Sequence, residues 1–208
     1  LSWLHECRQY HNCGSDPPEQ TFPIKLIDCS KNLIISADTS YKYAALSYVW
    51  GAQDETIPQT VDQDDTSNAR QGPDELLNAP RTIEDAITAT QNLNLRYLWV
   101  DRHCIDQNNA SEKHTQIAAM HLIYRSAEVT LVAACGDDDS FGLPGVGLTP
   151  RISLPEVTFG SLRLGLALPN PAQLLSKSRW SSRAWTYQEG LLSRRRLIFT
   201  TREVYLEC

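Results

Sequence analysis

The sequence lacks any apolar run that approaches the roughly 20 residues needed to cross a membrane as a helix. Its N-terminal stretch also lacks the pattern of a secretory signal peptide. With a formal net charge of −6, the chain lacks the broad basic surface by which proteins neutralise nucleic-acid phosphates. We therefore expect a cytoplasmic protein that neither spans a membrane nor binds nucleic acid.

Two further absences narrow the fold and the compartment. No G-x-G-x-x-G motif follows any strand-like segment, which disfavours the usual dinucleotide-binding fold. Six cysteines in 208 residues are too few for a disulfide scaffold. Cys104 and Cys135 lie in apolar contexts and are expected to be buried thiols in a reducing cytosol.

The N-terminal segment contains residue types that bind zinc, namely His5, Cys7, His11 and Cys13. Their spacing matches none of the common zinc motifs, and no second C-x-x-C or H-x-x-x-H follows downstream. We prefer a packed face of a small helix, formed by Trp3, Cys7, His11 and Cys13, and we expect no metal site.

The chain is expected to be part of a longer protein, because it begins at Leu1 without a Met and ends in a strand-like run. Residues 1–20 are polar and broken by prolines, and they are interpreted as an N-terminal extension. Residues 21–208 are interpreted as a single domain. Two polar or Gly/Pro-rich segments, near 52–79 and 136–179, are predicted to be insertions.

Three nearly continuous apolar segments, 43–51, 97–101 and 128–135, predict strands that are buried on both faces of a sheet. Helices are predicted between them, from Pro80 to about Leu93 and from Asn109 to Tyr124, and a third after residue 183. This alternation predicts an α/β fold with a parallel sheet of four or five strands flanked by helices. Hairpins are predicted over 22–35 and 157–168, and closing strands over 196–199 and 204–206.

The expected binding site lies beyond the carboxyl ends of these strands, where ligands bind to open parallel sheets. There, residues 47–51, 101–103 and the loop before Trp185 should converge. Trp185 and Glu189 are four residues apart and share one face of the last helix. A carboxylate beside an indole sits in a partly dry environment, which raises its pKa and suits it to acid–base work.

Three ordered blocks of sequence resemble the heterokaryon incompatibility (HET) domain of filamentous fungi. They are Leu-Ser-Tyr-Val-Trp-Gly at 46–51, Leu-Trp-Val-Asp-Arg-His-Cys-Ile-Asp-Gln at 98–107 and Arg-Ala-Trp-Thr-Tyr-Gln-Glu at 183–189. The resemblance spans roughly Tyr43 to Phe199. It implies an effector of programmed cell death in non-self recognition, usually one part of a longer chain.

The HET domain is in turn remotely similar to TIR domains, which carry a Trp-x-x-x-Glu on a late helix. This similarity implies a TIR-like, flavodoxin-like sheet that cleaves NAD⁺ between nicotinamide and ribose, with Glu189 as the catalytic residue. It implies NAD⁺ or NADP⁺ as the substrate, no other cofactor, and a homo-oligomer on activation. The residues expected to bind the substrate are Ser47, Tyr48, Trp50, Gly51, Asp101, Arg102, Arg183 and Trp185.

Alternative interpretations remain for the chain and for several of these residues. The protein can instead be a non-catalytic module that signals by self-association, with Glu189 salt-bridged and buried. A cysteine hydrolase using Cys104 with His103 or His114 is disfavoured because the thiol lies in an apolar run. Trp99 is expected to pack in the core. Asp101 and Asp106 can cap turns, and Arg183 can pair with Asp101.

Overall fold

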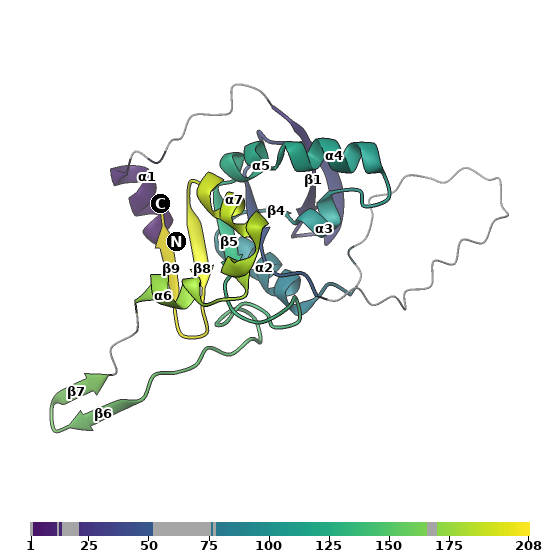
Figure 1. Cartoon of the computed structure of the whole chain (residues 1–208). Helices are drawn as coiled ribbons and strands as arrows, with labels where there is room; N and C mark the ends of the chain where they lie inside the picture. Colours follow the sequence, from purple (N-terminus) through teal and green to yellow (C-terminus); the bar gives the residue numbers. More distant parts are fainter. Residues whose placement is uncertain (1, 12, 14–20, 52–75, 77, 166–169) are drawn as a thin grey trace.

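The computed structural model describes residues 2–11, 13, 21–51, 76, 78–165 and 170–208. Its centre is a seven-stranded sheet in the order β2-β1-β4-β3-β5-β8-β9 (Figure 1). The strands are β1 (Pro23–Asp28), β2 (Leu33–Asp38), β3 (Tyr43–Ser47), β4 (Tyr97–Trp99), β5 (Val129–Ala133), β8 (Arg196–Phe199) and β9 (Val204–Glu207).

The four central strands, β4, β3, β5 and β8, run parallel, as the sequence predicts. The predicted N-terminal hairpin is present, and it extends the sheet, because β1 pairs antiparallel with β4. At the other edge, β9 pairs antiparallel with β8. If these four strands are numbered in chain order, they lie across the sheet in the order 2-1-3-4, which is the flavodoxin-like arrangement.

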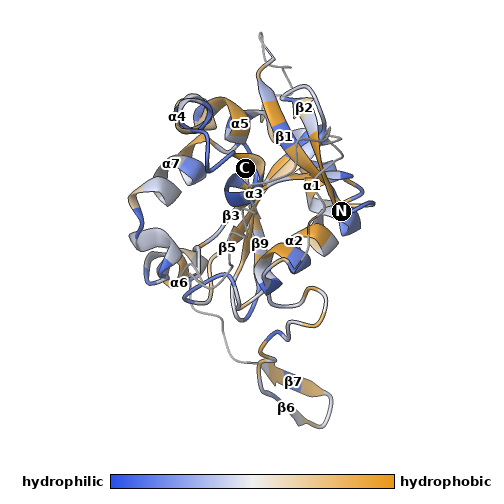
Figure 2. Cartoon of the chain, turned by 90° about the vertical axis from the view of Figure 1, so that its right-hand side faces the viewer, coloured by the Kyte–Doolittle hydropathy of each residue, from blue (hydrophilic) through white to orange (hydrophobic). Residues whose placement is uncertain are grey.

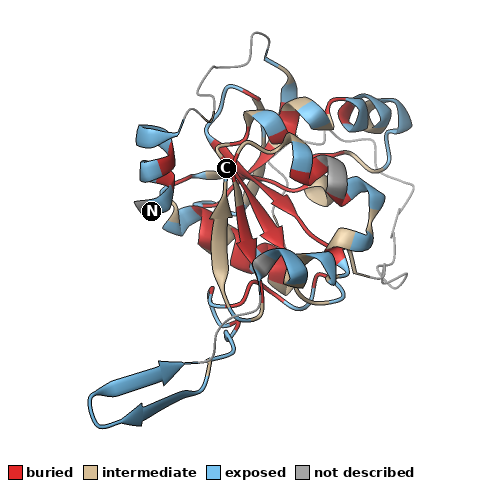
Figure 3. Ribbon diagram, turned by 60° about the vertical axis from the view of Figure 1, so that its left-hand side comes forward, coloured by how far each residue is buried: buried red, intermediate tan, exposed pale blue. Residues whose placement is uncertain are grey.

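The apolar character of the central strands follows from their burial. Every residue of β3 and of β5 is buried, since helices cover both faces of the sheet. Figure 3 shows these strands in red at the centre of the molecule. Trp99 is fully buried and packs edge-on against Tyr124, with ring centroids 5.4 Å apart. The expected core role of Trp99 is therefore confirmed.

The principal helices are α2 (Arg81–Asn92), α4 (Ala110–Ala118), α5 (Met120–Ser126) and α7 (Ala184–Leu192). Figure 2 shows α4, α5 and α7 on one side of the sheet and α2 on the other. The predicted helix from 109 to 124 is divided, because Ala119 has φ −90° and ψ 0° and ends α4. Its start is as predicted, since the Asn109 side chain accepts a hydrogen bond from the Glu112 N–H (3.1 Å).

The other helical elements are α1 (Ser2–Tyr10), α3 (Asp101–Cys104), α6 (Pro171–Ser176) and a 3₁₀ turn at Trp180–Ser182. The predicted hairpin in the 136–179 insertion is formed by β6 (Glu156–Phe159) and β7 (Leu162–Gly165), and it projects away from the sheet (Figure 3). The insertion predicted near 52–79 lies mostly outside the described residues. Within the part that is described, no helix has the length and apolar character to span a bilayer.

Candidate functional site

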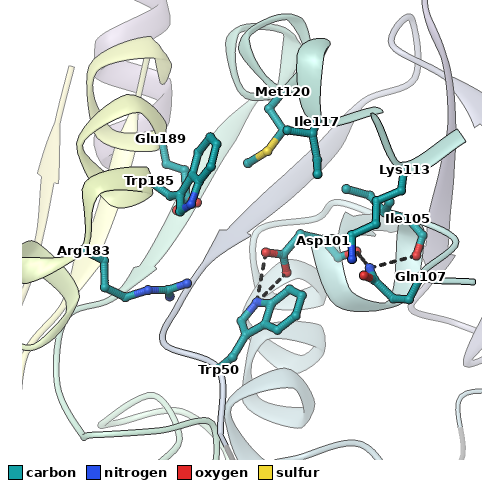
Figure 4. Close-up of a pocket in the computed structure, with 10 residues that line it drawn as sticks. All are labelled: Trp50, Asp101, Ile105, Gln107, Lys113, Ile117, Met120, Arg183, Trp185 and Glu189. Carbon is teal, nitrogen blue, oxygen red and sulfur yellow. Dashed lines mark hydrogen bonds between the residues drawn. The ribbon is translucent and has the colours of Figure 1, made fainter. Parts of the chain in front are cut away.

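The main candidate site is a cavity of about 260 Å³ at the carboxyl ends of β3 and β4, under α7 (Figure 4). Its location follows from the sheet topology, since β3 lies where the strand order reverses. The expected convergence of the three sequence blocks is confirmed, because each block contributes to the wall. The lining residues are Trp50, Asp101, Ile105, Gln107, Lys113, Ile117, Met120, Arg183, Trp185 and Glu189.

Glu189 is positioned by the end of β3. The Ser47 hydroxyl donates a hydrogen bond to the Glu189 carboxylate Oε2, and the Trp180 indole N–H donates to the Ser47 hydroxyl oxygen (2.7 Å). Ser47 is the last residue of β3 and is 1% exposed. Trp180, in the 3₁₀ turn before α7, is 5% exposed. The three side chains form a buried chain of hydrogen bonds that fixes the carboxylate.

The surroundings of Glu189 make its protonation state sensitive to pH. The side chain is 5% exposed, and this burial raises its pKa to about 7. The Ser47 hydrogen bond and the positive charge of Arg183 lower the pKa, whereas the negative charge of Asp101 raises it. Both protonation states are therefore populated near neutral pH, a property suited to acid–base or charge-stabilising chemistry.

Asp101 is a second desolvated carboxylate in the same cavity. It begins α3, with one residue between it and the end of β4. Its carboxylate oxygens accept hydrogen bonds from the Trp50 indole N–H at 3.0 and 3.1 Å. It also accepts the Arg102 backbone N–H (2.7 Å), so the expected role in the following turn is present as well. Burial raises the pKa of Asp101 to about 6, although both hydrogen bonds act against that rise.

Cations and apolar groups complete the wall. Arg183 precedes α7, and its guanidinium Nη1 donates to the Tyr48 carbonyl at 2.6 Å while lining the cavity. Trp185 is 52% exposed, and Figure 4 shows its indole on the side of the cavity opposite Ile117 and Met120. An exposed ring facing an apolar wall provides a slot for a flat group.

Four residues expected to bind substrate do not line the cavity, namely Ser47, Tyr48, Gly51 and Arg102. Ser47 is buried and contacts Glu189 instead. Tyr48 is 3% exposed, so its ring is unable to stack on a ligand. Gly51 packs against Asp139, whose Oδ1 would lie 2.2 Å from a Cβ atom at this position, so the neighbour that the structure places close to this glycine is a side chain. Arg102 pairs with Asp139 (2.9 Å) and lies 5.9 Å above the Trp50 ring.

Several lining or supporting residues were not predicted from the sequence. Trp180 was missed because its partner Ser47 is 133 positions away, and no spacing rule connects them. Gln107 belongs to the second sequence block without a spacing that marks it as a lining residue, and its side-chain amide donates to the Ile105 carbonyl (3.1 Å) at the cavity wall. Lys113 lies one turn into α4, where its charge was a poor signal among other surface lysines.

The cysteine-hydrolase interpretation is wrong. Cys104 is 1% exposed, and burial raises the pKa of its thiol to about 12, so it stays protonated at neutral pH. His114 is exposed to solvent on α4. The expectation for Asp106 holds, since its carboxylate accepts the Asn108 N–H (2.9 Å) in the turn before α4.

The N-terminal cysteine and histidine residues are arranged differently from the packed face that we expected. Trp3 is 48% exposed and His11 is exposed, so neither packs in the interior. Instead, Cys7, His11 and Cys13 gather with Cys208, with their ligand atoms all within 4.8 Å of one another. Cys208 lies at the other end of the chain, so no local spacing indicates it as a partner.

A family model described as heterokaryon incompatibility protein (HET) matches residues 43–189, which is more than half of the chain. The matched range runs from the first residue of β3 to Glu189, so it contains all ten residues that line the cavity. Searches of curated proteins and of solved structures found no significant match. The chain belongs to the heterokaryon incompatibility (HET) family.

Proposed function

We propose that this HET domain is a death effector that hydrolyses NAD⁺ at the bond between nicotinamide and ribose. The observation that carries the proposal is a buried carboxylate of raised pKa, Glu189, in a cavity at the strand ends, one helical turn from the exposed Trp185. The similarity of the Trp-x-x-x-Glu pattern to that of TIR domains points to the same bond. In the reaction, the C–N bond breaks and its electron pair leaves with nicotinamide. Water then adds to the ribosyl cation and releases a proton, giving ADP-ribose.

The proposed roles follow from the placement of each group. The ionised Glu189 stabilises the positive charge that develops on the ribose, as a carboxylate does in glycoside hydrolysis. Trp185 stacks on the nicotinamide ring. Arg183 pairs with the pyrophosphate, for which a planar guanidinium is suited. Asp101, whose carboxylate is oriented by the Trp50 indole N–H, accepts a hydrogen bond from a ribose hydroxyl.

The size of the cavity bears on assembly. Its volume of about 260 Å³ is below the roughly 300–1,000 Å³ of typical small-molecule pockets. It therefore suits the nicotinamide–ribose half of a dinucleotide better than the whole. A second copy of the chain would complete the site for the remaining half, which agrees with oligomerisation on activation.

The test is nicotinamide release from NAD⁺ by the wild type and by Glu189→Gln, each fused to an oligomerising tag so that assembly is not limiting. Glu84→Gln is the matched control, because Glu84 is exposed on the opposite helix α2. We expect the Glu189 variant to lose at least about 100-fold in rate, while the control retains full activity. A demonstrably assembled wild type without turnover would reject the proposal.

A non-catalytic association module is the second candidate, and the β6–β7 hairpin favours it. Val157 pairs with Leu164 and Phe159 pairs with Leu162, so the four apolar side chains share one face of the hairpin. Each of them is at least 50% exposed. The burial of Glu189 also fits this candidate, whereas the cavity that it lines fits the first. Assembly without NAD⁺ turnover would support the module.

A further inference from the structure

A second site lies away from the cavity, beside the edge strand β9 of the sheet. Figure 1 shows α1 beside the C-terminal end of β9. There Cys7, His11, Cys13 and Cys208 place three sulfur atoms and one imidazole nitrogen within 4.8 Å of one another. All four residues come from segments that the NAD⁺ proposal does not use.

The fold brings these four side chains together by two local features. Cys7 and His11 are one helical turn apart. The His11 backbone N–H donates to the Cys7 carbonyl (3.1 Å), so the helical hydrogen-bond pattern of α1 extends to His11. Leu4 and Cys7 are 6% and 1% exposed, so they anchor α1 on the body of the protein. Cys208 directly follows β9, which is held in the sheet by its pairing with β8.

The donor set and its dimensions are those of a tetrahedral zinc site. Zinc bonds of about 2.3 Å to sulfur and about 2.0 Å to nitrogen place neighbouring ligand atoms about 3.5–3.8 Å apart. The four ligand atoms lie within 4.8 Å of one another, and the His11 Nδ1 atom lies 3.0 Å from the Cys208 sulfur. These distances lie on both sides of the zinc range, so small side-chain rotations would bring the four atoms to tetrahedral spacing. Cys7, Cys13 and Cys208 are all free thiols in the described structure, so all three sulfur atoms are available to a metal.

A charged neighbour supports metal binding independently of these distances. Zinc held by three thiolates and a neutral imidazole carries one net negative charge. The Arg195 guanidinium is 6% exposed, and its Nε donates to the Cys7 sulfur at 3.1 Å. A buried cation that donates to a ligand sulfur offsets that excess charge and orients the ligand, as outer groups do in metal sites.

We propose that Cys7, His11, Cys13 and Cys208 bind one structural zinc ion. Four protein ligands leave no open coordination position, so the ion has no catalytic role. It fastens α1 to the end of β9. A helix of nine residues is too short to be stable alone, so the metal supplies part of the free energy that keeps α1 folded on the domain.

The first experiment measures zinc per chain by mass spectrometry after purification under reducing conditions and dialysis. The chain is compared with Cys208→Ser and with the control Cys135→Ser, a cysteine outside the cluster. We expect about one zinc per chain in the wild type and the control, and at least a 10-fold lower content in Cys208→Ser. No stoichiometric zinc in the wild type, even after zinc is added, overturns the proposal, as does a disulfide within the four residues.

A second measurement covers the case in which Cys208→Ser fails to fold. Cobalt replaces zinc in the wild type, and its absorption spectrum reports a tetrahedral site with thiolate ligands. Hydrogen exchange is then followed after the metal is removed by a chelator. Faster exchange confined to α1 and β9, with β3 and β5 unchanged, supports a metal that fastens the helix. Unchanged exchange throughout, or an octahedral cobalt spectrum, contradicts it.

Discussion

The hydroxyl of Ser47 donates a hydrogen bond to the carboxylate of Glu189, although 142 positions separate the two residues in sequence. The contact joins the end of the central strand β3 to the helix α7 that roofs the cavity. The Ser47 hydroxyl also accepts a hydrogen bond from the Trp180 indole N–H (2.7 Å). One hydroxyl therefore connects β3, α7 and the 3₁₀ turn that contains Trp180. The protonation state of Glu189 therefore depends on the packing of the sheet beneath it.

Replacing Ser47 with alanine should destabilise the domain by about 1–3 kcal/mol, because the Trp180 N–H and the Glu189 carboxylate each lose a buried partner. The measurement is urea denaturation followed by tryptophan fluorescence. Ser36→Ala, at an exposed position of the edge strand β2, is the control and should change the stability little. Equal effects of the two substitutions would show that the buried hydroxyl contributes nothing specific.

The rate of nicotinamide release should rise with pH and level off above an inflection near 7, because the proposed mechanism uses the ionised form of Glu189, whose pKa is about 7. The Ser47 hydrogen bond lowers that pKa. Ser47→Ala should therefore move the inflection to higher pH. Initial rates from pH 5.5 to 9 measure it. A pH profile identical in wild type and Ser47→Ala would argue against Glu189 as the titrating group.

The stability of the folded state should also report on Glu189. Its pKa is raised from 4.5 to about 7 on folding, so the folded state binds the proton more tightly than the unfolded state. The resulting stabilisation is fully present below pH 4.5 and is lost as the pH rises through 7.

Relative to Glu189→Gln, the wild type should therefore lose up to ~3 kcal/mol of unfolding free energy between pH 4.5 and pH 8. Denaturant unfolding of both proteins at several pH values gives this difference, in which the titration of Asp101 and other shared groups largely cancels. A difference that stays constant with pH would mean that Glu189 has an ordinary pKa in the folded protein.

Arg183→Ala should raise the KM for NAD⁺ by about 10-fold or more with a smaller change in kcat, because a pyrophosphate contact contributes mainly to binding. Arg179→Ala removes a nearby exposed arginine and should leave KM unchanged. Steady-state kinetics of the two tagged variants distinguish them. If both change KM equally, the general positive charge of this region, and not Arg183 itself, attracts the substrate.

Self-association should depend on the apolar face of the β6–β7 hairpin. Phe159→Asp places a charge among the exposed apolar side chains, and we expect it to weaken association by at least about 10-fold. Thr158→Asp alters the opposite face of the same strand and is the matched control. Sedimentation velocity over a range of concentrations measures both. An equal loss in the two variants would indicate a general charge effect.

The sequence predicts well what depends on local pattern. The apolar runs that became β3 and β5 indicated strands buried on both faces, and every residue of both is buried. The spacing of Trp185 and Glu189 indicated a shared helix face, and both line the cavity.

What the sequence could not show are contacts between distant segments. The pairing of Trp180 with Ser47, and of Cys208 with the N-terminal cysteines, has no signature in local spacing. Gly51 was expected to approach a phosphate, since glycine indicates only that something comes close. The structure identifies that neighbour as Asp139.

The break at Ala119 has a consequence for the shape of the cavity. Ile117 belongs to α4 and Met120 to α5, so the wall that faces Trp185 is carried by two short helices instead of one continuous rod. The width of the slot is set by the angle between them. Because α4 packs on α5, a small rotation of α4 would widen the slot for a bulky ring while the hydrogen-bonded strands below stay in register.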